Sequence, residues 1–301
     1  MRQRAIHPAA RLSVLLPAIV LCALLAACGT VTQSPAPTGP AASAAATATG
    51  SHPIDAATYR VYFGLGSTSG NPILAPVERT STPAPPDAGM GAAMQALVAG
   101  PNATELGASP AMFTAIPAGT QVNGVQLAGG VATVDLSQEF EDTDELPSLR
   151  TALAQLVFTL TQFPEVTGVQ VTIAGAVLSQ TDADGQDLGR PATRADYGDQ
   201  MGPLFVDSPS WGATVHSPIH LSGLADVFEA TFQFRLLDAD GRSLANHQLV
   251  ASCGTGCLGS FAVEVPYNVA ASTAARLQVF DLSEADGSMA DVVDYSLTLL
   301  P

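Results

Sequence analysis

The sequence predicts two folded domains of different class. Residues 59–178 should form an α+β domain with helices packed on a sheet, and residues 203–301 an all-β immunoglobulin-like sandwich. In the first part, helix-period and strand-period hydrophobic segments are interspersed. In the second, short strand-like runs are separated by turn signals, and no helical stripe competes with them. Residues 179–202 are polar and rich in Gly and Asp, so we expect a linker there.

The N-terminus has the layout of an export signal. A positively charged start precedes an apolar run over residues 12–26, and small residues end the run just before Cys28. Such a run is typical of a signal peptide, and it is marginal for crossing a bilayer, which takes about 20 apolar residues. We therefore expect residues 1–27 to be removed. An uncleaved membrane anchor and a conventional cleaved signal are the alternatives.

The tetrapeptide Leu25-Ala26-Ala27-Cys28 resembles a lipobox, the recognition site of lipoprotein processing. The resemblance implies cleavage after Ala27 and a diacylglycerol thioether on the sulfur of Cys28. Two or more acyl chains hold a protein stably at a membrane. The residues that follow are mostly Ala, Ser, Thr, Pro and Gly, so residues 28–57 are predicted to form a disordered tether. Cys22 is expected to act only as a small hydrophobe within the signal.

The charge of the chain limits its partners. It has 11 basic residues, all arginine, against 27 acidic residues, which gives a net charge of −16. Removing residues 1–27 takes away Arg2, Arg4 and Arg11 and leaves a net charge of −19. An acidic chain of this kind repels phosphate backbones, which argues against a nucleic-acid partner. An anionic membrane surface would repel it as well, so attachment needs a covalent or apolar device.

In the first domain, each expected element follows from hydrophobic period and turn residues. Two helices are predicted, one capped by Asp87 and ended by Gly100-Pro101, the other opened by Ser148 and ended by Pro164. Gly129-Gly130 should form a tight hairpin turn. The expected strands are 59–63, 121–127, 131–136 and 169–173.

In the second domain, two Asp-Gly turns supply the residues with positive φ that hairpins need. They lie at Asp238-Ala239-Asp240-Gly241 and Glu284-Ala285-Asp286-Gly287. The expected strands are 219–223, 228–237, 243–252, 260–265, 276–282 and 292–299.

Four blocks in the first domain resemble the GerMN domain of sporulation and spore-germination proteins, and they occur in the family's order. The resemblance implies an α+β fold that serves as a protein-interaction or assembly module without known catalysis. The blocks are Leu97-Val98-Ala99-Gly100-Pro101, Ala115–Thr120, Ala132–Ser137 and Gln155–Pro164.

The second domain resembles the immunoglobulin-like domain associated with bacterial spore germination, which often follows a GerMN domain. The resemblance supports the β-sandwich. It rests on Asp207-Ser208-Pro209, Val215–Pro218, Ser222-Gly223, Val227–Thr231 and Gly259–Phe261.

Cysteine and histidine side chains are the first candidates for a site. Cys253 and Cys257 are expected to form a disulfide, because an exported protein meets an oxidising compartment. A metal site would need more ligands, and His247 alone is a poor complement. His216 and His220 could form a metal pair, but we expect two exposed or hydrogen-bonded imidazoles.

Three acidic sites invite a functional interpretation. Asp135 is expected to hydrogen-bond a neighbouring turn at a strand end, and Glu229 to make a cross-strand bond or anchor a loop. The run Asp182-Ala183-Asp184-Gly185-Gln186-Asp187 resembles part of a calcium loop, but the glycine is fourth and not sixth, and no Glu stands at the twelfth position. A solvated turn is the expected structure there.

The sequence contains no nucleophile elbow, zinc-protease helix, phosphate loop or dinucleotide fingerprint. We therefore expect no enzymatic activity, no cofactor and no metal. The expected protein is a lipoprotein on the extracytoplasmic face of the cell membrane that docks envelope proteins or wall components. One alternative is an envelope enzyme acting on cell-wall polymers, with a cleft that gathers His216, His220 or His247 and carboxylates. The other is a small-ligand-binding lipoprotein, which requires an apolar pocket.

Overall fold

The structure is a computed structural model that describes residues 57–66, 73–81, 88–142, 146–179, 187–283 and 285–301. All described residues belong to one unit of the chain, residues 52–301. The predicted signal peptide, the cleavage site Ala27-Cys28 and almost all of the tether lie outside the described residues.

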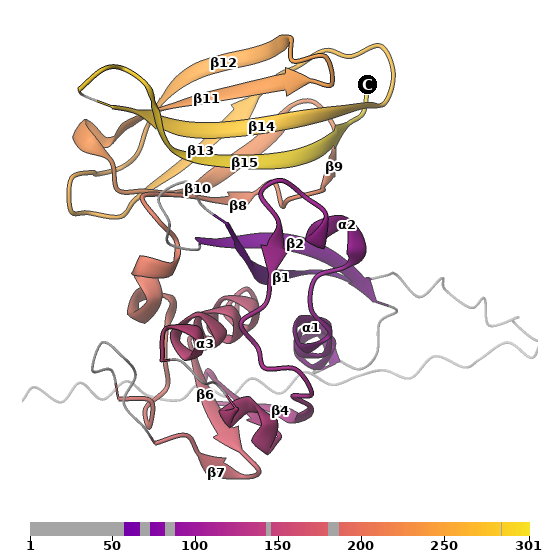
Figure 1. Cartoon of the computed structure of the whole chain (residues 1–301), viewed down its shortest axis with the longest axis vertical. Helices are drawn as coiled ribbons and strands as arrows, with labels where there is room; N and C mark the ends of the chain where they lie inside the picture. The colour runs from indigo at the N-terminus through magenta and orange to yellow at the C-terminus, as the bar shows by residue number, and fades with distance from the viewer. Residues whose placement is uncertain (1–56, 67–72, 82–87, 143–145, 180–186, 284) are drawn as a thin grey trace, which may run out of the picture. The chain divides into compact units, whose positions relative to one another are not determined.

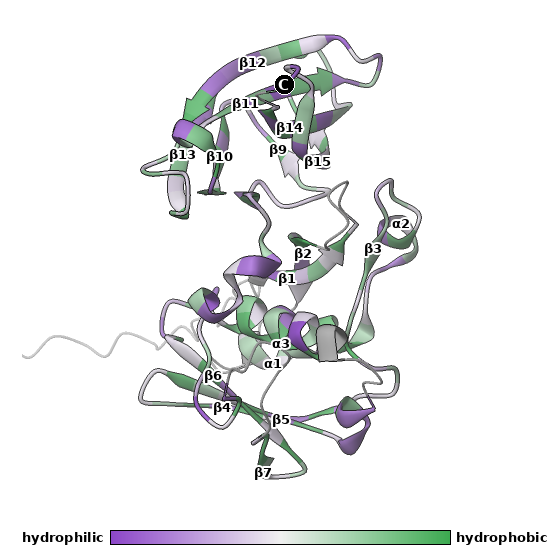
Figure 2. Ribbon diagram, turned by 60° about the vertical axis from the view of Figure 1, so that its left-hand side comes forward, coloured by the Kyte–Doolittle hydropathy of each residue, from purple (hydrophilic) through white to green (hydrophobic). Residues whose placement is uncertain are grey.

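The first domain has three layers, with two helices between two sheets (Figure 1). One sheet has the order β2-β1-β3, and the other has the order β4-β5-β6-β7. Hydrophobic residues run along much of the two helices (Figure 2). The first sheet consists of β1 (Ala57–Leu65), β2 (Ile73–Ser81) and β3 (Met112–Phe113). The second consists of β4 (Val122–Ala128), β5 (Val131–Leu136), β6 (Gly168–Ile173) and β7 (Ala176–Val177). The helices are α1 (Ala88–Ala99), α2 (Ala103–Leu106), α3 (Leu146–Leu160) and the 3-10 turn η1 (Gln138–Glu141).

The burial of helix α3 explains why the first domain has three layers. From Thr151 to Leu160 every residue is buried, so no face of this part of the helix is left for water. A helix buried all round needs cover on opposite sides. It packs on β1 and on α1, and it also contacts β6 of the second sheet. The prediction of helices on a sheet holds, but they lie between two sheets rather than on one.

Most predicted elements of this domain are present, and β2 is the main one that the sequence analysis missed. Gly129 and Gly130 form the β4–β5 turn, with φ values of 57° and 83°. β2 contains Pro76, which lacks the backbone N–H that a central strand needs. It is tolerated because β2 is an edge of its sheet.

The predicted linker, residues 179–202, is more ordered than expected. Its later part forms the 3-10 segment η2 (Arg194–Gln200). Leu188, Ala192, Tyr197 and Met201 are buried, which a solvated connection would not allow. The polar linker prediction was therefore incomplete, because apolar residues spaced through a polar segment were not recognised as packing residues.

The second domain is a sandwich of two sheets, ordered β13-β10-β8 and β12-β11-β14-β15-β9 (Figure 1). The inner faces supply a core that includes Leu221, Phe234, Leu277 and Tyr295. The predicted fold class, an α+β domain followed by an immunoglobulin-like sandwich, is confirmed. The strands are β8 (Leu204–Ser208), β9 (Thr214–Val215), β10 (Ile219–Ala225), β11 (Thr231–Asp238), β12 (Ser243–Val250), β13 (Gly259–Val265), β14 (Thr273–Leu282) and β15 (Met289–Leu299).

One predicted strand begins too early. Residues 228–230 form the 3-10 turn η3 (Phe228–Ala230) instead of the start of β11. Glu229 and Ala230 have φ values of 51° and 58°, which lie outside the β region that regular strand residues adopt. The turn carries the chain from one sheet of the sandwich to the other, since β10 and β11 belong to different sheets.

Candidate functional site

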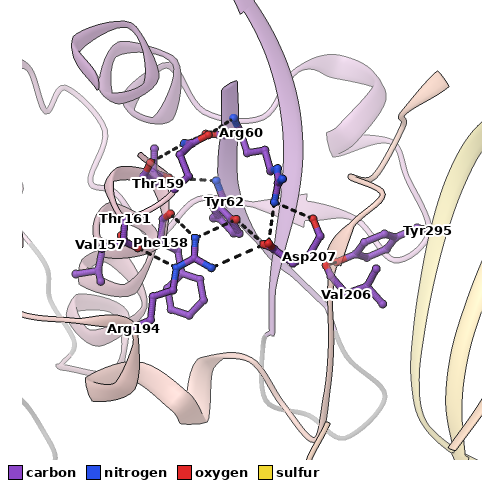
Figure 3. Close-up of polar contacts among 11 residues, drawn as sticks. Arg60, Tyr62, Val157, Phe158, Thr159, Thr161, Arg194, Val206, Asp207 and Tyr295 are labelled. Atoms are coloured by element: carbon purple, nitrogen blue, oxygen red, sulfur yellow. Dashed lines mark hydrogen bonds and ion pairs between the residues drawn. The ribbon is translucent and has the colours of Figure 1, made fainter. Parts of the chain in front are cut away.

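The densest polar cluster of the described residues surrounds Asp207 on β8, where the first domain meets the second (Figure 3). The Tyr62 hydroxyl donates a 2.6 Å hydrogen bond to Asp207 Oδ1. Arg60 Nη1 donates to Asp207 Oδ2 at 2.8 Å and to the Asp207 carbonyl at 3.1 Å. Arg194 Nη1 lies 3.8 Å from Asp207 Oδ1. One carboxylate thus joins β1, β8 and η2.

Arg194 fixes the other side of the cluster. Its Nε donates to Thr161 Oγ1 at 2.8 Å, and its Nη2 donates to the Phe158 carbonyl and the Tyr62 hydroxyl, each at 3.2 Å. The guanidinium carbon lies 4.7 Å from the Phe158 ring centroid and 5.2 Å from that of Tyr62. A guanidinium held this way stabilises the aromatic pair by hydrogen bonding and by cation–π attraction together.

Polar side chains in the C-terminal half of α3 and just after its end hold β1 in place beneath the cluster. Gln162 Oε1 accepts from the Arg60 backbone N–H at 2.6 Å, and its Nε2 donates to the Arg60 carbonyl at 2.5 Å. Thr159 Oγ1 accepts from the Tyr62 N–H at 3.2 Å, and Gln155 Nε2 donates to the Tyr62 carbonyl at 3.1 Å. These side chains replace a neighbouring strand, because β3 pairs with β1 only at Gly64 and Leu65.

A buried aromatic cluster continues the contact between the domains. Phe205 of β8 lies 6.5 Å from Tyr62 and 5.8 Å from Phe158, measured between ring centroids. The Tyr295 hydroxyl donates to the Val206 carbonyl at 3.1 Å, which ties β15 to the same strand. The backbone N–H of Trp211 donates to the Pro76 carbonyl at 2.9 Å. Aromatic burial and hydrogen bonds therefore fix the position of β8 on the first domain.

A groove of about 640 Å³ opens beside the cluster. Its lining includes Tyr59, Arg60, Gln162, Arg194 and Asp207. Arg60 and Arg194 both face the single carboxylate of Asp207, so the cluster carries two positive charges against one negative charge. These polar groups connect the first domain to the second at the edge of the groove.

Electrostatics support a structural role for Tyr62. Burial raises the pKa of Tyr62 to about 12; Arg194 opposes the rise, and the Asp207 carboxylate adds to it. The hydroxyl is therefore protonated at neutral pH and serves as a donor to Asp207. Burial also raises the pKa of Tyr295 well above its usual value.

The structure joins Cys253 to Cys257 by a disulfide, with Cα atoms 5.8 Å apart. The bond closes the loop between β12 and β13. Thr255 N–H within this loop donates to the Val227 carbonyl at 3.1 Å, so the loop is bound to the segment before η3.

The three histidines of the second domain do not converge. His216 Nδ1 lies 3.5 Å from the Pro301 carbonyl, and His220 Nδ1 lies 3.0 Å from Glu264 Oε1. The His247 ring stacks on Phe234 at 6.3 Å. In the part of the chain that the structure describes, no group of three or more His, Cys, Asp or Glu side chains could hold a metal ion.

The acidic residues that the sequence singled out make different contacts in the structure. Asp135 Oδ1 accepts from Thr172 Oγ1 and from the Gly175 backbone N–H, each at 2.7 Å, so it anchors the β6–β7 turn as expected. The Glu229 carbonyl accepts from Thr231 Oγ1 within η3. Most of the predicted solvated turn, residues 182–186, lies outside the described residues. Asp187 caps the Gly189 backbone N–H at 2.8 Å.

Sequence reasoning missed the cluster around Asp207. Asp207 was only part of a family block, Arg194 lay in the presumed linker, and Arg60 was read as a strand residue. The available signal was the polar residues Gln155, Thr159 and Gln162, which stand among apolar residues in the last turns of α3 and just after it. That placement indicates side chains that bond to backbone inside a core.

No helix among the described residues combines the length and the apolar character needed to cross a membrane.

Two family models match the chain. Residues 60–179 match the Germane family, described as sporulation and spore germination, and residues 204–288 match the immunoglobulin-like domain of bacterial spore germination. A search of curated proteins finds no match.

Several solved structures are similar. The first GerMN domain of the sporulation protein GerM from Bacillus subtilis is 22% identical, with a TM-score of 0.36, over 46% of this chain and 99% of that one. The tandem GerMN domains of the same protein are 17% identical, with a TM-score of 0.38, over 70% of this chain and 62% of that one. A protein from Clostridium perfringens described as a lipoprotein is 17% identical, with a TM-score of 0.33, over 48% of this chain and 93% of that one.

Proposed function

Since the chain carries a Germane domain followed by the immunoglobulin-like domain of bacterial spore germination, we propose that it is a lipid-anchored docking protein of the cell envelope. Cys28 carries the acyl chains, and residues 28–57 tether the folded part to the extracytoplasmic face of the membrane. The two domains bind envelope proteins or wall components and catalyse no reaction.

The observation that carries this proposal is the use of the Asp207 cluster. The arginines, the tyrosine and the carboxylate of this cluster are bonded to one another across the domain junction. They hold two domains as one unit, as a scaffold that presents surfaces to partners requires. The enzyme alternative needs His216, His220 or His247 in a cleft with carboxylates. His220 lies 3.0 Å from Glu264, but both side chains are 60% exposed.

The length of the tether fits the same role. Thirty residues of Ala-, Ser- and Pro-rich coil have a typical reach of about 30 Å, from about 5–6 Å times the square root of the residue number. The folded part can therefore reach partners near the membrane surface while it stays attached to the membrane. Its net charge of −19 disfavours adsorption to an anionic leaflet.

Chemical cross-linking of intact cells, followed by purification of the full-length protein, tests the docking function. We expect specific envelope components to be recovered with the full chain and lost when residues 59–301 are deleted from the anchored protein. Equal recovery with the lipidated tether alone would contradict the proposal. Turnover of a wall polymer by the purified full chain would favour the enzyme alternative instead.

A further inference from the structure

At one end of the five-stranded sheet, where β11 begins and β12 and β14 end, the outer face carries exposed apolar side chains. Val250 lies opposite Thr231, and Leu282 lies opposite Met289. Directly opposed residues of antiparallel strands point to the same face. Thr231 alternates with the buried Phe232 and therefore faces outward, and Val250 faces outward with it.

A side-chain contact shows that the β14–β15 pair presents the same face. Arg235 Nη2 lies 3.2 Å from Met289 Sδ, and the Arg235 guanidinium covers the Phe280 ring at 5.2 Å. Phe280 lies opposite Gln233, so Leu282, two residues further along β14, continues the row beside Thr231. We call Val250, Leu282 and Met289 the apolar patch.

The apolar patch is exposed to an unusual degree for this chain. Val250 is 65% exposed, Leu282 43% and Met289 37%, and Phe228, in the turn just before β11, is 55% exposed. These four side chains are half of the eight exposed large hydrophobic residues among those described. The same outer face is polar elsewhere, at Gln233, Asn246, Gln248 and Gln278. Clustering of this kind marks an interaction surface more than scattered exposure does.

The surroundings of the apolar patch are rigidly built. Asp291 adopts a left-handed conformation with φ of 49°, in the irregularity of the β14–β15 pair that turns Met289 outward. The Ala251 N–H donates to the Ala230 carbonyl at 2.9 Å, and the disulfide loop bonds to Val227. A surface fixed before binding loses little conformational entropy when a partner docks.

Two exposed carboxylates lie beside this end of the sandwich, and we call them the acidic rim. Glu229 is in η3, next to the exposed Phe228, and Asp286 is in the hairpin between β14 and β15. Asp281 alternates with Leu282, and Asp291 lines a hollow with Ile73 and Gly202, so these two carboxylates face away from the apolar patch. The acidic rim and the net charge of −16 of the whole chain favour a positively charged neighbour around an apolar contact.

We propose that the apolar patch docks a protein segment whose apolar side chains are flanked by lysine or arginine. This inference rests on the proposed docking function and names its surface and the chemistry of its partner. A second copy would bring acidic rim against acidic rim, and an anionic bilayer would be repelled by the same carboxylates.

Binding of two model peptides to the purified full-length chain tests the proposal. One alternates leucine with lysine, and the other alternates leucine with glutamate, so the apolar content is equal and only the charge differs. Fluorescence anisotropy should show tighter binding of the leucine–lysine peptide. The double variant Val250→Ser with Leu282→Ser should weaken that binding at least about tenfold, which corresponds to about 1.4 kcal/mol.

The matched control is the double variant Val177→Ser with Leu127→Ser, which removes apolar side chains of similar exposure, 49% and 37%, from the first domain. It should bind the leucine–lysine peptide as the unchanged chain does. Because all four positions are exposed, circular dichroism should show all variants folded. Unchanged binding by the patch variant, equal binding of the leucine–glutamate peptide, or an equal loss in the control variant would overturn the proposal.

Two further measurements separate other occupants and the underlying function. Patch-dependent binding to phosphatidylglycerol vesicles, or patch-dependent dimers in light scattering, would assign the surface to a membrane or to a second copy and overturn the proposal. If the patch variant recovers every envelope partner in cells while deletion of residues 59–301 loses them, the docking function stands and this surface is wrong. If the deletion also keeps its partners, the docking function itself fails.

Discussion

At the scale of single residues, Asp207 makes the largest difference to how this chain is held together. Its carboxylate accepts from Tyr62 and Arg60 and lies near Arg194. Hydrogen bonds to a charged group contribute more than neutral ones, but partial exposure of these side chains to water weakens them.

Replacing the Asp207 carboxylate measures how much it stabilises the folded protein. Asp207→Ala leaves the Tyr62 hydroxyl and the Arg60 guanidinium without their acceptor, so we expect the free energy of unfolding to fall by about 1–2 kcal/mol. Urea denaturation measures the change. The control is Asp240→Ala, in an exposed hairpin turn, which should change stability much less. An equal loss in both variants would show that Asp207 has no special position.

Because of Tyr62, we expect the stability of the folded protein to depend on pH in the alkaline range. The folded-state pKa of Tyr62, about 12, lies above the usual value of 10.0 because the phenolate is disfavoured by burial. The stabilising contribution is therefore complete below pH 10 and is lost as the pH rises through about 12. Thermal melts across this window should show a smaller loss of stability in Tyr62→Phe than in the unchanged chain. The same loss in both would contradict this assignment, with Tyr295 as the next group to substitute.

At the scale of elements, helix α3 supplies apolar side chains to the core and polar side chains that bond to buried backbone groups. Only the first role could be predicted from its sequence. Its apolar residues predicted a broad buried stripe, and the helix is buried as expected. Its polar residues were not predicted to be core groups, because pattern analysis assigns polar side chains to a solvent face. Gln155 is buried because the Tyr62 carbonyl and the Ala115 N–H need partners.

Removing the Gln155 side chain should therefore lower the free energy of unfolding. Gln155→Ala leaves the buried Tyr62 carbonyl and the partly buried Ala115 N–H without these partners, so the free energy of unfolding should fall by about 2–4 kcal/mol. Gln126→Ala, on the exposed strand β4, provides the control and should have little effect. A loss below about 0.5 kcal/mol for Gln155→Ala would mean that the backbone groups find other partners.

The disulfide in the loop between β12 and β13 should also contribute to stability. Opening the Cys253–Cys257 bond by the double variant Cys253→Ser with Cys257→Ser should destabilise the protein by about 2 kcal/mol, because the closed loop is short. Chemical denaturation with and without reductant measures this. Reductant should lower the midpoint of the unchanged chain to that of the variant and leave the variant itself unaffected. Free thiols in protein isolated from cells would contradict the bond.

At the scale of the whole molecule, much of the architecture could be predicted and the domain junction could not. The hydrophobic periods located α1, α3 and the hairpin at Gly129-Gly130, because each depends on residues close in sequence. The contacts of Asp207 join residues up to 147 positions apart, and no local pattern reports such a pairing. β2 was missed for a related reason, since its proline is acceptable only at a sheet edge, a property of the assembled sheet.

The proposed docking role depends on export of the chain and on a lipid anchor at Cys28. Mass spectrometry of the N-terminal peptide from membrane-extracted protein tests both. We expect a chain that begins at Cys28, carries the mass of a diacylglycerol and leaves the membrane fraction when Cys28→Ser is introduced. A chain that keeps Met1, or an unmodified Cys28 in protein that still sediments with membranes, would contradict this expectation.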